Sequence, residues 1–219
     1  MITYNDIKHN ESINTYIKKA DESLSALGFT EHSFAHVGLV ASRAEHILKT
    51  MGFDPHSIEL VKIASHLHDI GNIVNRREHS QSGAVMAFRI LDKLNMAPSD
   101  IATIVTAIGN HDEGEGEAVN PVAAALIIAD KSDVRRTRVR NRDFSTFDIH
   151  DRVNYSVMET SLEINEEKTK IILKLTIDTE ISPVIDYFEI FLNRMLMCKK
   201  AARALSLEFK LTINDQPII

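Results

Sequence analysis

The spacing of the apolar residues changes once along this chain, near residue 150, and that change limits the fold more than any other feature. Before it, apolar residues recur every three or four positions, as in the segment 101–108; after it they alternate with polar residues, as in 171–177. The first pattern is typical of amphipathic helices and the second of half-buried strands. The sequence therefore predicts a mainly α protein, with a helical domain over 1–150 and a smaller α+β unit over 151–219.

Local signals divide each part further. A cap residue followed by proline, at Asp54-Pro55 and again at Asn120-Pro121, marks the start of a helix. After residue 150, two alternating runs separated by a polar turn predict a hairpin, an amphipathic helix follows over 183–204, and a last strand covers 207–213. The C-terminal unit is therefore predicted as ββαβ, a small sheet with one face under a helix.

Composition excludes several classes of protein. The 219 residues include one cysteine, Cys198, which excludes a disulfide scaffold and a cysteine zinc ribbon. The 25 lysines and arginines against 31 acidic residues give a net charge of −6, which argues against a nucleic-acid partner. Charge interrupts every apolar run and the first residues lack one, so no membrane span or signal peptide is expected. The expected location is the cytoplasm.

Histidine and aspartate residues fall at helix ends and inside apolar helices. The set comprises His36, His68, Asp69, His79, His111 and Asp130. Asp130 is the most informative, because a lone carboxylate in the apolar run ALIIADK is costly to bury without a partner or a cation. Any one of the histidines taken alone is typical of a helix cap or a surface position. Together they indicate a divalent metal site built where helix ends converge.

The order H…HD…D resembles the HD-domain superfamily of metal-dependent phosphohydrolases, over about residues 30–135. His36 matches the first histidine of that pattern, His68-Asp69 the defining dyad, and Asp130 the final aspartate. The resemblance implies the helical HD-domain fold, a divalent metal (Mn, Fe, Ni, Zn or Mg) and hydrolysis of a phosphate ester or anhydride.

Two further histidines resemble those of dinuclear members such as the HD-domain diadenosine tetraphosphatases. His79 followed by Gly83-Ala84 is similar to their H-x-x-x-G-A element, and His111 to their next histidine. The resemblance then implies two cations bridged by Asp69. The first would be held by His36, His68 and Asp130, and the second by His79 and His111.

The cyclic-dinucleotide phosphodiesterases of the HD-GYP group fit less well. They carry two adjacent histidines where this chain has Asn110-His111, and a lysine where this chain has Asn72. Both differences argue against cyclic-dinucleotide hydrolysis.

Catalysis at such a site needs an activated water and cations for the phosphate. Bound metal lowers the pKa of water from about 15.7 to about 7 and holds the phosphoryl oxygens. Besides Asp69, the candidate catalytic residues are Lys131, next to the metal aspartate, and Arg76 and Arg77, just after HDIGN. The arginine-rich stretch 135–142 is a solvated face, a phosphate-binding patch or a contact between domains.

The predicted function is hydrolysis of a small phosphorylated molecule, with a nucleotide as the leading substrate class. An HD-type di-iron oxygenase remains an alternative enzyme, because iron accepts the same ligands. A non-catalytic metal- or nucleotide-sensing module is the alternative outside enzymes. The helix over 183–204 carries more apolar surface than one small sheet covers, which predicts packing against the helical domain or a homodimer.

Overall fold

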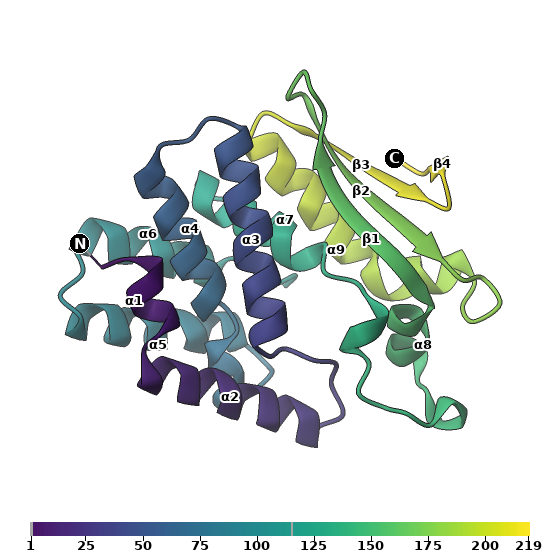
Figure 1. Ribbon diagram of the computed structural model, residues 1–219, viewed down its shortest axis with the longest axis horizontal. Coiled ribbons are helices and arrows are strands. Elements are labelled where there is room, and N and C mark those ends of the chain that lie inside the picture. The colour runs from purple at the N-terminus through teal and green to yellow at the C-terminus, as the bar shows by residue number, and fades with distance from the viewer. Residues whose placement is uncertain (1, 115) are drawn as a thin grey trace.

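A computed structural model describes residues 2–114 and 116–219. Figure 1 shows a bundle of helices at one end of the molecule and a small twisted sheet at the other. The helices of the bundle are α1 (Tyr4–Lys8), α2 (Glu11–Ala26), α3 (Phe34–Thr50), α4 (Pro55–Leu67), α5 (His79–Lys93), α6 (Pro98–Gly109) and α7 (Pro121–Lys131). The C-terminal part contains α8 (Ile149–Ser156), β1 (Val157–Ile164), β2 (Lys170–Ile177), α9 (Val184–Ala204), β3 (Glu208–Ile213) and β4 (Gln216–Pro217). Short 3₁₀ helices cover Ile70–Ile73, Arg136–Arg138 and Phe144–Thr146.

The cap signals in the sequence act as predicted. The Asp54 carboxylate accepts hydrogen bonds from the backbone N–H groups of His56 and Ser57, and the Asn120 side chain accepts one from Ala123. These bonds satisfy N–H groups that have no partner within the first turn of a helix. Prolines follow both caps at positions where no donor is needed.

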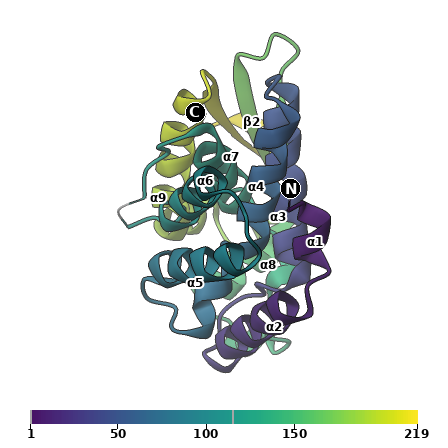
Figure 2. The same ribbon diagram turned by 90° about the vertical axis from the view of Figure 1, so that its left-hand side faces the viewer.

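Helix α7 lies in the middle of the molecule, in contact with α3, α4, α6 and α9 (Figures 1 and 2). Every side chain from Val122 to Ala129 is buried. Five alanine or valine residues among these eight let neighbouring helices approach closely, so α7 has no solvent-facing stripe until Asp130. A helix buried all round explains why its apolar residues show so little 3.6-residue periodicity.

The C-terminal sheet has the strand order β1-β2-β3-β4. β1 and β2 form the antiparallel hairpin, and α9 is the crossover between the parallel strands β2 and β3. The apolar side of the sheet, including Leu173 and Leu211, is fully buried, whereas Lys174 and Glu208 on the other side are exposed. A sheet covered on one face explains the alternation in the sequence.

The predicted mainly α fold with a small C-terminal α+β unit is confirmed. α9 contacts both β3 and α7. The apolar surface that the sheet leaves uncovered is therefore packed against the helical bundle, which was the first of the two predicted arrangements. The homodimer stays a prediction. The structure adds α1 and β4, which the sequence did not suggest, and it places residue 150 inside α8. Among the described residues, no helix combines the length and apolarity needed to cross a membrane.

Candidate metal centre

The six candidate ligands come from the ends of four helices and from the third position of a fifth. His36 lies in the first turn of α3. His68 ends α4 and is followed directly by Asp69, whose turn leads into a short 3₁₀ helix, Ile70–Ile73. His79 begins α5, His111 follows α6, and Asp130 is the penultimate residue of α7. All four histidines are buried, and 12% of the Asp130 side chain is exposed.

The side chains converge on one point in two pairs of histidines. The Nε2 atoms of His36 and His68 lie 3.3 Å apart, and those of His79 and His111 lie 3.1 Å apart. Asp69 stands between the pairs: its Oδ2 is 3.3 Å from His68 Nε2, and its Oδ1 is 3.4 Å from His79 Nε2. The two oxygens of one carboxylate thus face two different histidine pairs.

Asp130 belongs to the first pair. Its Oδ1 lies 3.3 Å from His36 Nε2 and 3.7 Å from His68 Nε2. The ligand atoms of His36, His68 and Asp130 all lie within 4.8 Å of one another, and so do those of His68, Asp69 and His111. The sequence-derived set is therefore assembled in space, with Asp69 at its centre.

The outward-facing nitrogen of each imidazole is bonded to an oxygen acceptor. Nδ1 of His68, His79 and His111 lies 2.7, 3.1 and 2.6 Å from the carbonyl oxygens of Ser65, Arg76 and Ile108, respectively. Nδ1 of His36 lies 2.7 Å from Oδ2 of Asp133. An acceptor at Nδ1 fixes the proton there, so in the neutral rings every Nε2 presents a lone pair to the centre.

This arrangement fits divalent cations. Neutral Nε2 atoms that face each other at 3.1–3.3 Å cannot bond to one another, because neither carries a proton. Asp69 Oδ2 is buried and has no hydrogen-bond donor among the residues that the structure describes. Imidazole nitrogens and carboxylate oxygens are the ligands that first-row transition metals accept. His79 Nε2 has Arg76 Nη1 at 3.4 Å, and a cation between the rings would supply the partner that the other lone pairs lack.

The pKa values point to the same need for positive charge. Burial by itself lowers the pKa of His68, but Asp69 and Asp130 outweigh burial and raise it to about 10. Burial by itself raises the pKa of Asp69, yet the neighbouring His68 and His36 hold it well below its ordinary value. Without a metal ion, a protonated His68 therefore supplies the positive charge that the two ionised carboxylates need, and a cation bound to its neutral Nε2 would take over that role.

Two supporting residues were not singled out from the sequence. Asp133 accepts from His36 and is itself held by Arg135, whose Nε lies 2.8 Å from Asp133 Oδ1. Asn72 donates from Nδ2 to both the carbonyl oxygen and Oδ1 of Asp69, each at 2.9 Å. The spacing of Asp133, three residues after Asp130, could have suggested a shared helical face, but the sequence gives no sign of its contact with His36.

The proposed phosphate-binding cations occupy three different environments. Arg76 faces the cluster, with Nη1 3.4 Å from both His79 Nε2 and Asn72 Oδ1, and it forms no ion pair within the described part of the chain. Lys131 is buried, and its Nζ lies 2.8 Å from Asp130, 3.4 Å from Glu113 and 3.6 Å from Asp112. Arg77 is exposed and lines a shallow surface groove with Glu78 and Gln81, away from the contacts of the cluster.

The arginine-rich stretch 135–142 mainly ties segments of this chain together. Arg135 pairs with Glu31 in the loop before α3, and Arg140 pairs with Asp21 on α2. Arg136 donates to the carbonyl oxygen of Tyr155 in α8 and lies over its ring. Of the three interpretations of this stretch, contact between parts of the fold is the one that these bonds support.

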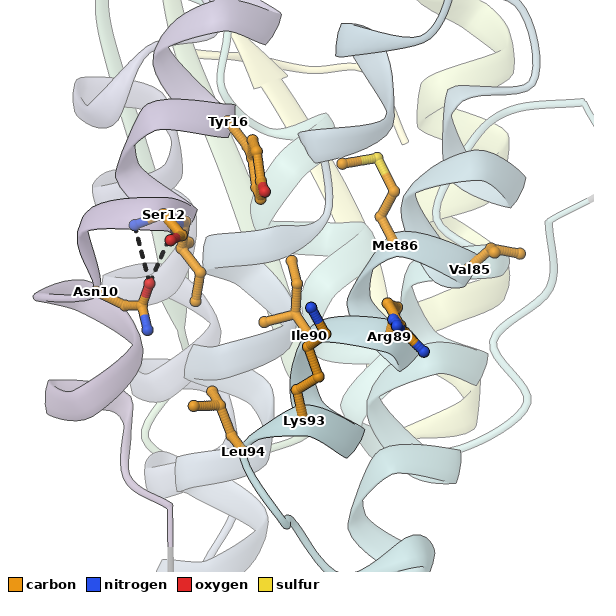
Figure 3. A pocket seen from close by; sticks show the side chains of 10 residues that line it. Asn10, Ser12, Tyr16, Val85, Met86, Arg89, Ile90, Lys93 and Leu94 are labelled. Atoms are coloured by element: carbon orange, nitrogen blue, oxygen red, sulfur yellow. Dashed lines mark hydrogen bonds between the residues drawn. The ribbon is translucent and has the colours of Figure 1, made fainter.

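Two cavities bear on ligand binding. One, of about 370 Å³, is lined by His32 and Arg76 beside the cluster and by residues of α8 and α9. The other, of about 470 Å³, is a groove between α2 and α5 that includes Tyr16, Met86 and Ile90 (Figure 3). None of the six candidate metal ligands lines the groove of Figure 3.

The HD-domain family model matches residues 33–138 of this chain. This segment is an HD domain. The match spans all six candidate ligands and ends before α8, so the C-terminal sheet and α9 lie outside the HD domain.

A protein of Methanocaldococcus jannaschii and one of an uncultured Thermotogales bacterium are similar to this chain. An uncharacterized protein of Methanocaldococcus jannaschii is 25% identical over 189 residues, which cover 75% of this chain and 72% of the relative. The aligned part of this chain is longer than residues 33–138, so the similarity includes residues outside the HD domain. A predicted HD superfamily hydrolase from an uncultured Thermotogales bacterium, of known crystal structure, is 23% identical with a TM-score of 0.46, covering 58% of this chain and 69% of that one.

Proposed function

We propose that this protein is a metal-dependent phosphohydrolase that cleaves a small phosphate ester or anhydride, with a nucleotide as the substrate class. The observation that carries the proposal is the convergence of four histidine Nε2 lone pairs on the two oxygens of Asp69. The arrangement desolvates two ionised carboxylates at once, a cost that bound cations would offset.

The residues divide between two cation positions. His36, His68 and Asp130 face one of them, and His79 and His111 face the other. Asp69 directs one oxygen to each position, which suits a bridging carboxylate. Divalent metals held by these residues would lower the pKa of a bound water and stabilise the charge of the phosphoryl group.

The protein's own groups orient these ligands and neutralise charge. Asp133 and the backbone carbonyl groups fix the imidazole tautomers, and Asn72 fixes the plane of the Asp69 carboxylate. Arg76 is the guanidinium available for the phosphate, because it borders the second histidine pair without a carboxylate partner among the described residues. Lys131 Nζ lies 2.8 Å from Asp130 Oδ2, and its positive charge stabilises the ionised form of that carboxylate.

Metal analysis followed by a phosphate-release assay tests this proposal. Protein purified without chelator is expected to contain divalent metal and to release phosphate from nucleotides, with or without oxygen. His68→Ala should lose both properties. Turnover that requires oxygen and releases no phosphate would indicate the di-iron oxygenase instead. Tight nucleotide binding without turnover in metal-loaded protein would indicate a sensing module.

A further inference from the structure

The cavity of about 370 Å³ lies beside the histidine cluster, but none of the six candidate metal ligands lines it. The ring of His32, which lines it, packs edge-on against His36 with 5.4 Å between centroids. Arg76, on another wall, lies 3.4 Å from Nε2 of His79. The volume falls within the range of small-molecule sites, which is about 300–1,000 Å³. A molecule in this cavity therefore contacts one residue that touches each histidine pair, His32 on one side and Arg76 on the other.

Much of the cavity wall comes from outside the HD domain. Phe29 precedes the domain, whereas Asp151 lies on α8 and Arg194 on α9. The three side chains offer different chemistry: a flat apolar ring, a carboxylate acceptor and a guanidinium donor. They come from segments up to 165 positions apart, so only the packing of α8 and α9 against the HD domain brings them together.

Each of the three keeps part of its side chain for a ligand, although Arg76 Cζ lies 5.8 Å from the centroid of the Phe29 ring and Arg194 Cζ lies 4.5 Å from that of Phe191. The Phe29 side chain is 40% exposed, while its carbonyl oxygen is held by Arg140 Nε at 3.2 Å. Asp151 receives one long side-chain hydrogen bond, 3.4 Å from Asn141 Nδ2, and burial together with Asp148 raises its pKa. Arg194 uses Nε to bond Glu113 at 2.7 Å, which leaves its Nη groups for another acceptor.

The geometry points to a nucleoside subsite: we propose that Phe29, Asp151 and Arg194 bind the nucleoside part of the substrate while its phosphate faces Arg76 and the histidine cluster. A nucleobase has a flat face for the Phe29 ring, and bases and ribose together carry both donors for Asp151 and acceptors for Arg194. This inference rests on the proposed function and deepens it, because it assigns substrate selection to residues outside the HD domain.

Calorimetric titration of the metal-loaded protein tests the subsite without turnover. The probes are the four nucleoside 5′-methylenephosphonates, whose P–C bond replaces the scissile ester, and methylphosphonate, which lacks the nucleoside. Wild type is expected to bind at least one nucleoside phosphonate more tightly than methylphosphonate. Phe29→Ala, Asp151→Asn and Arg194→Met should each reduce this affinity ratio by about tenfold.

Two matched controls keep the comparison specific. Lys200→Met removes a cation from the exposed side of α9, and Phe88→Ala removes an exposed ring from α5; neither residue lines the cavity. Both should keep the wild-type affinity ratio. Because Phe29 and Asp151 are at least partly exposed, their variants are expected to keep the wild-type unfolding temperature and metal content.

The outcomes separate this inference from the proposed function. A wild-type ratio near one, or an unchanged ratio in all three cavity variants, overturns the nucleoside subsite. If wild type nevertheless contains metal and releases phosphate, the phosphohydrolase proposal stands without the subsite. Absence of metal and of phosphate release overturns the phosphohydrolase proposal itself, whatever the titrations give.

Discussion

Oδ2 of Asp133 lies 2.7 Å from Nδ1 of His36, joining two buried residues that are 97 positions apart in the sequence. Both side chains are fully buried. The carboxylate holds the proton of the imidazole on Nδ1 and so turns the Nε2 lone pair toward Asp69 and Asp130. Arg135 Nε bonds the other oxygen of this carboxylate, Oδ1, at 2.8 Å, and Arg138 Nη1 lies 3.7 Å from Oδ2. One ion-paired aspartate thus links the arginine-rich stretch to the candidate metal centre.

Replacing this aspartate tests its orienting role. Asp133→Asn keeps the shape of the side chain but removes the charge, and should weaken metal binding by about 10- to 100-fold, the usual effect of losing an outer partner of a ligating histidine. Competition with a chromogenic chelator measures the affinity. Asp143→Asn, at an exposed cap, is the control and should leave the affinity unchanged. Equal metal affinities in wild type and Asp133→Asn would show that Asp133 does not orient His36 for metal binding.

Gly71, in the HDIGN segment, is expected to tolerate no side chain. A Cβ atom there would overlap the carbonyl oxygen of His79 and approach Gly83 N to 2.5 Å, and both are backbone atoms that cannot rotate away. Gly71→Ala should therefore destabilise the fold by about 1–3 kcal/mol and displace His79. Denaturant unfolding measures the first effect and metal content the second.

Gly38 provides the matched control for that substitution. It lies inside α3, and an added Cβ meets no atom within 4 Å. Gly38→Ala should raise the free energy of unfolding by about 0.5–1 kcal/mol, since alanine is the better helix former. Similar destabilisation by both substitutions would show that close packing at Gly71 is not the cause.

Cys198 is expected to be unreactive in the folded protein. It is fully buried, and burial raises its pKa to about 12, so the nucleophilic thiolate is absent at neutral pH. Between its ordinary pKa of 9.0 and about 12, only the unfolded chain loses this proton, so the group lowers stability as pH rises through that window. Iodoacetamide at pH 8 should label unfolded but not native protein. Equal labelling rates would contradict the burial of this thiol.

The sequence predicts most of the fold because its signals are local. Periodicity and caps depend on neighbours within one or two turns, so helices such as α4 and α7 begin where Asp54 and Asn120 predict. The small helix α1 was missed because its five residues are too short for a periodic pattern. Strand β4 has two residues and is likewise too short to show a periodic pattern.

The candidate site is predicted in its ligands but not in its surroundings. The six histidine and aspartate positions are recognisable by their order and by the apolar setting of Asp130. The roles of Asp133 and Arg194 depend on contacts between distant segments, and no local pattern encodes them. The sequence likewise shows that Lys131 follows Asp130. It does not show that Asp112 and Glu113, from another loop, lie beside the Lys131 ammonium group.

The number of bound metal ions tests the central claim most directly. Elemental analysis of protein purified without chelator should give about two divalent ions per chain in wild type, one in His79→Ala and in His111→Ala, and none in Asp69→Ala, which removes the carboxylate facing both positions. His36→Ala should spare the second position more than the first, and phosphate release should fall in all four variants. One ion in wild type, with His79→Ala and His111→Ala retaining both that ion and phosphate release, would contradict the two-metal centre.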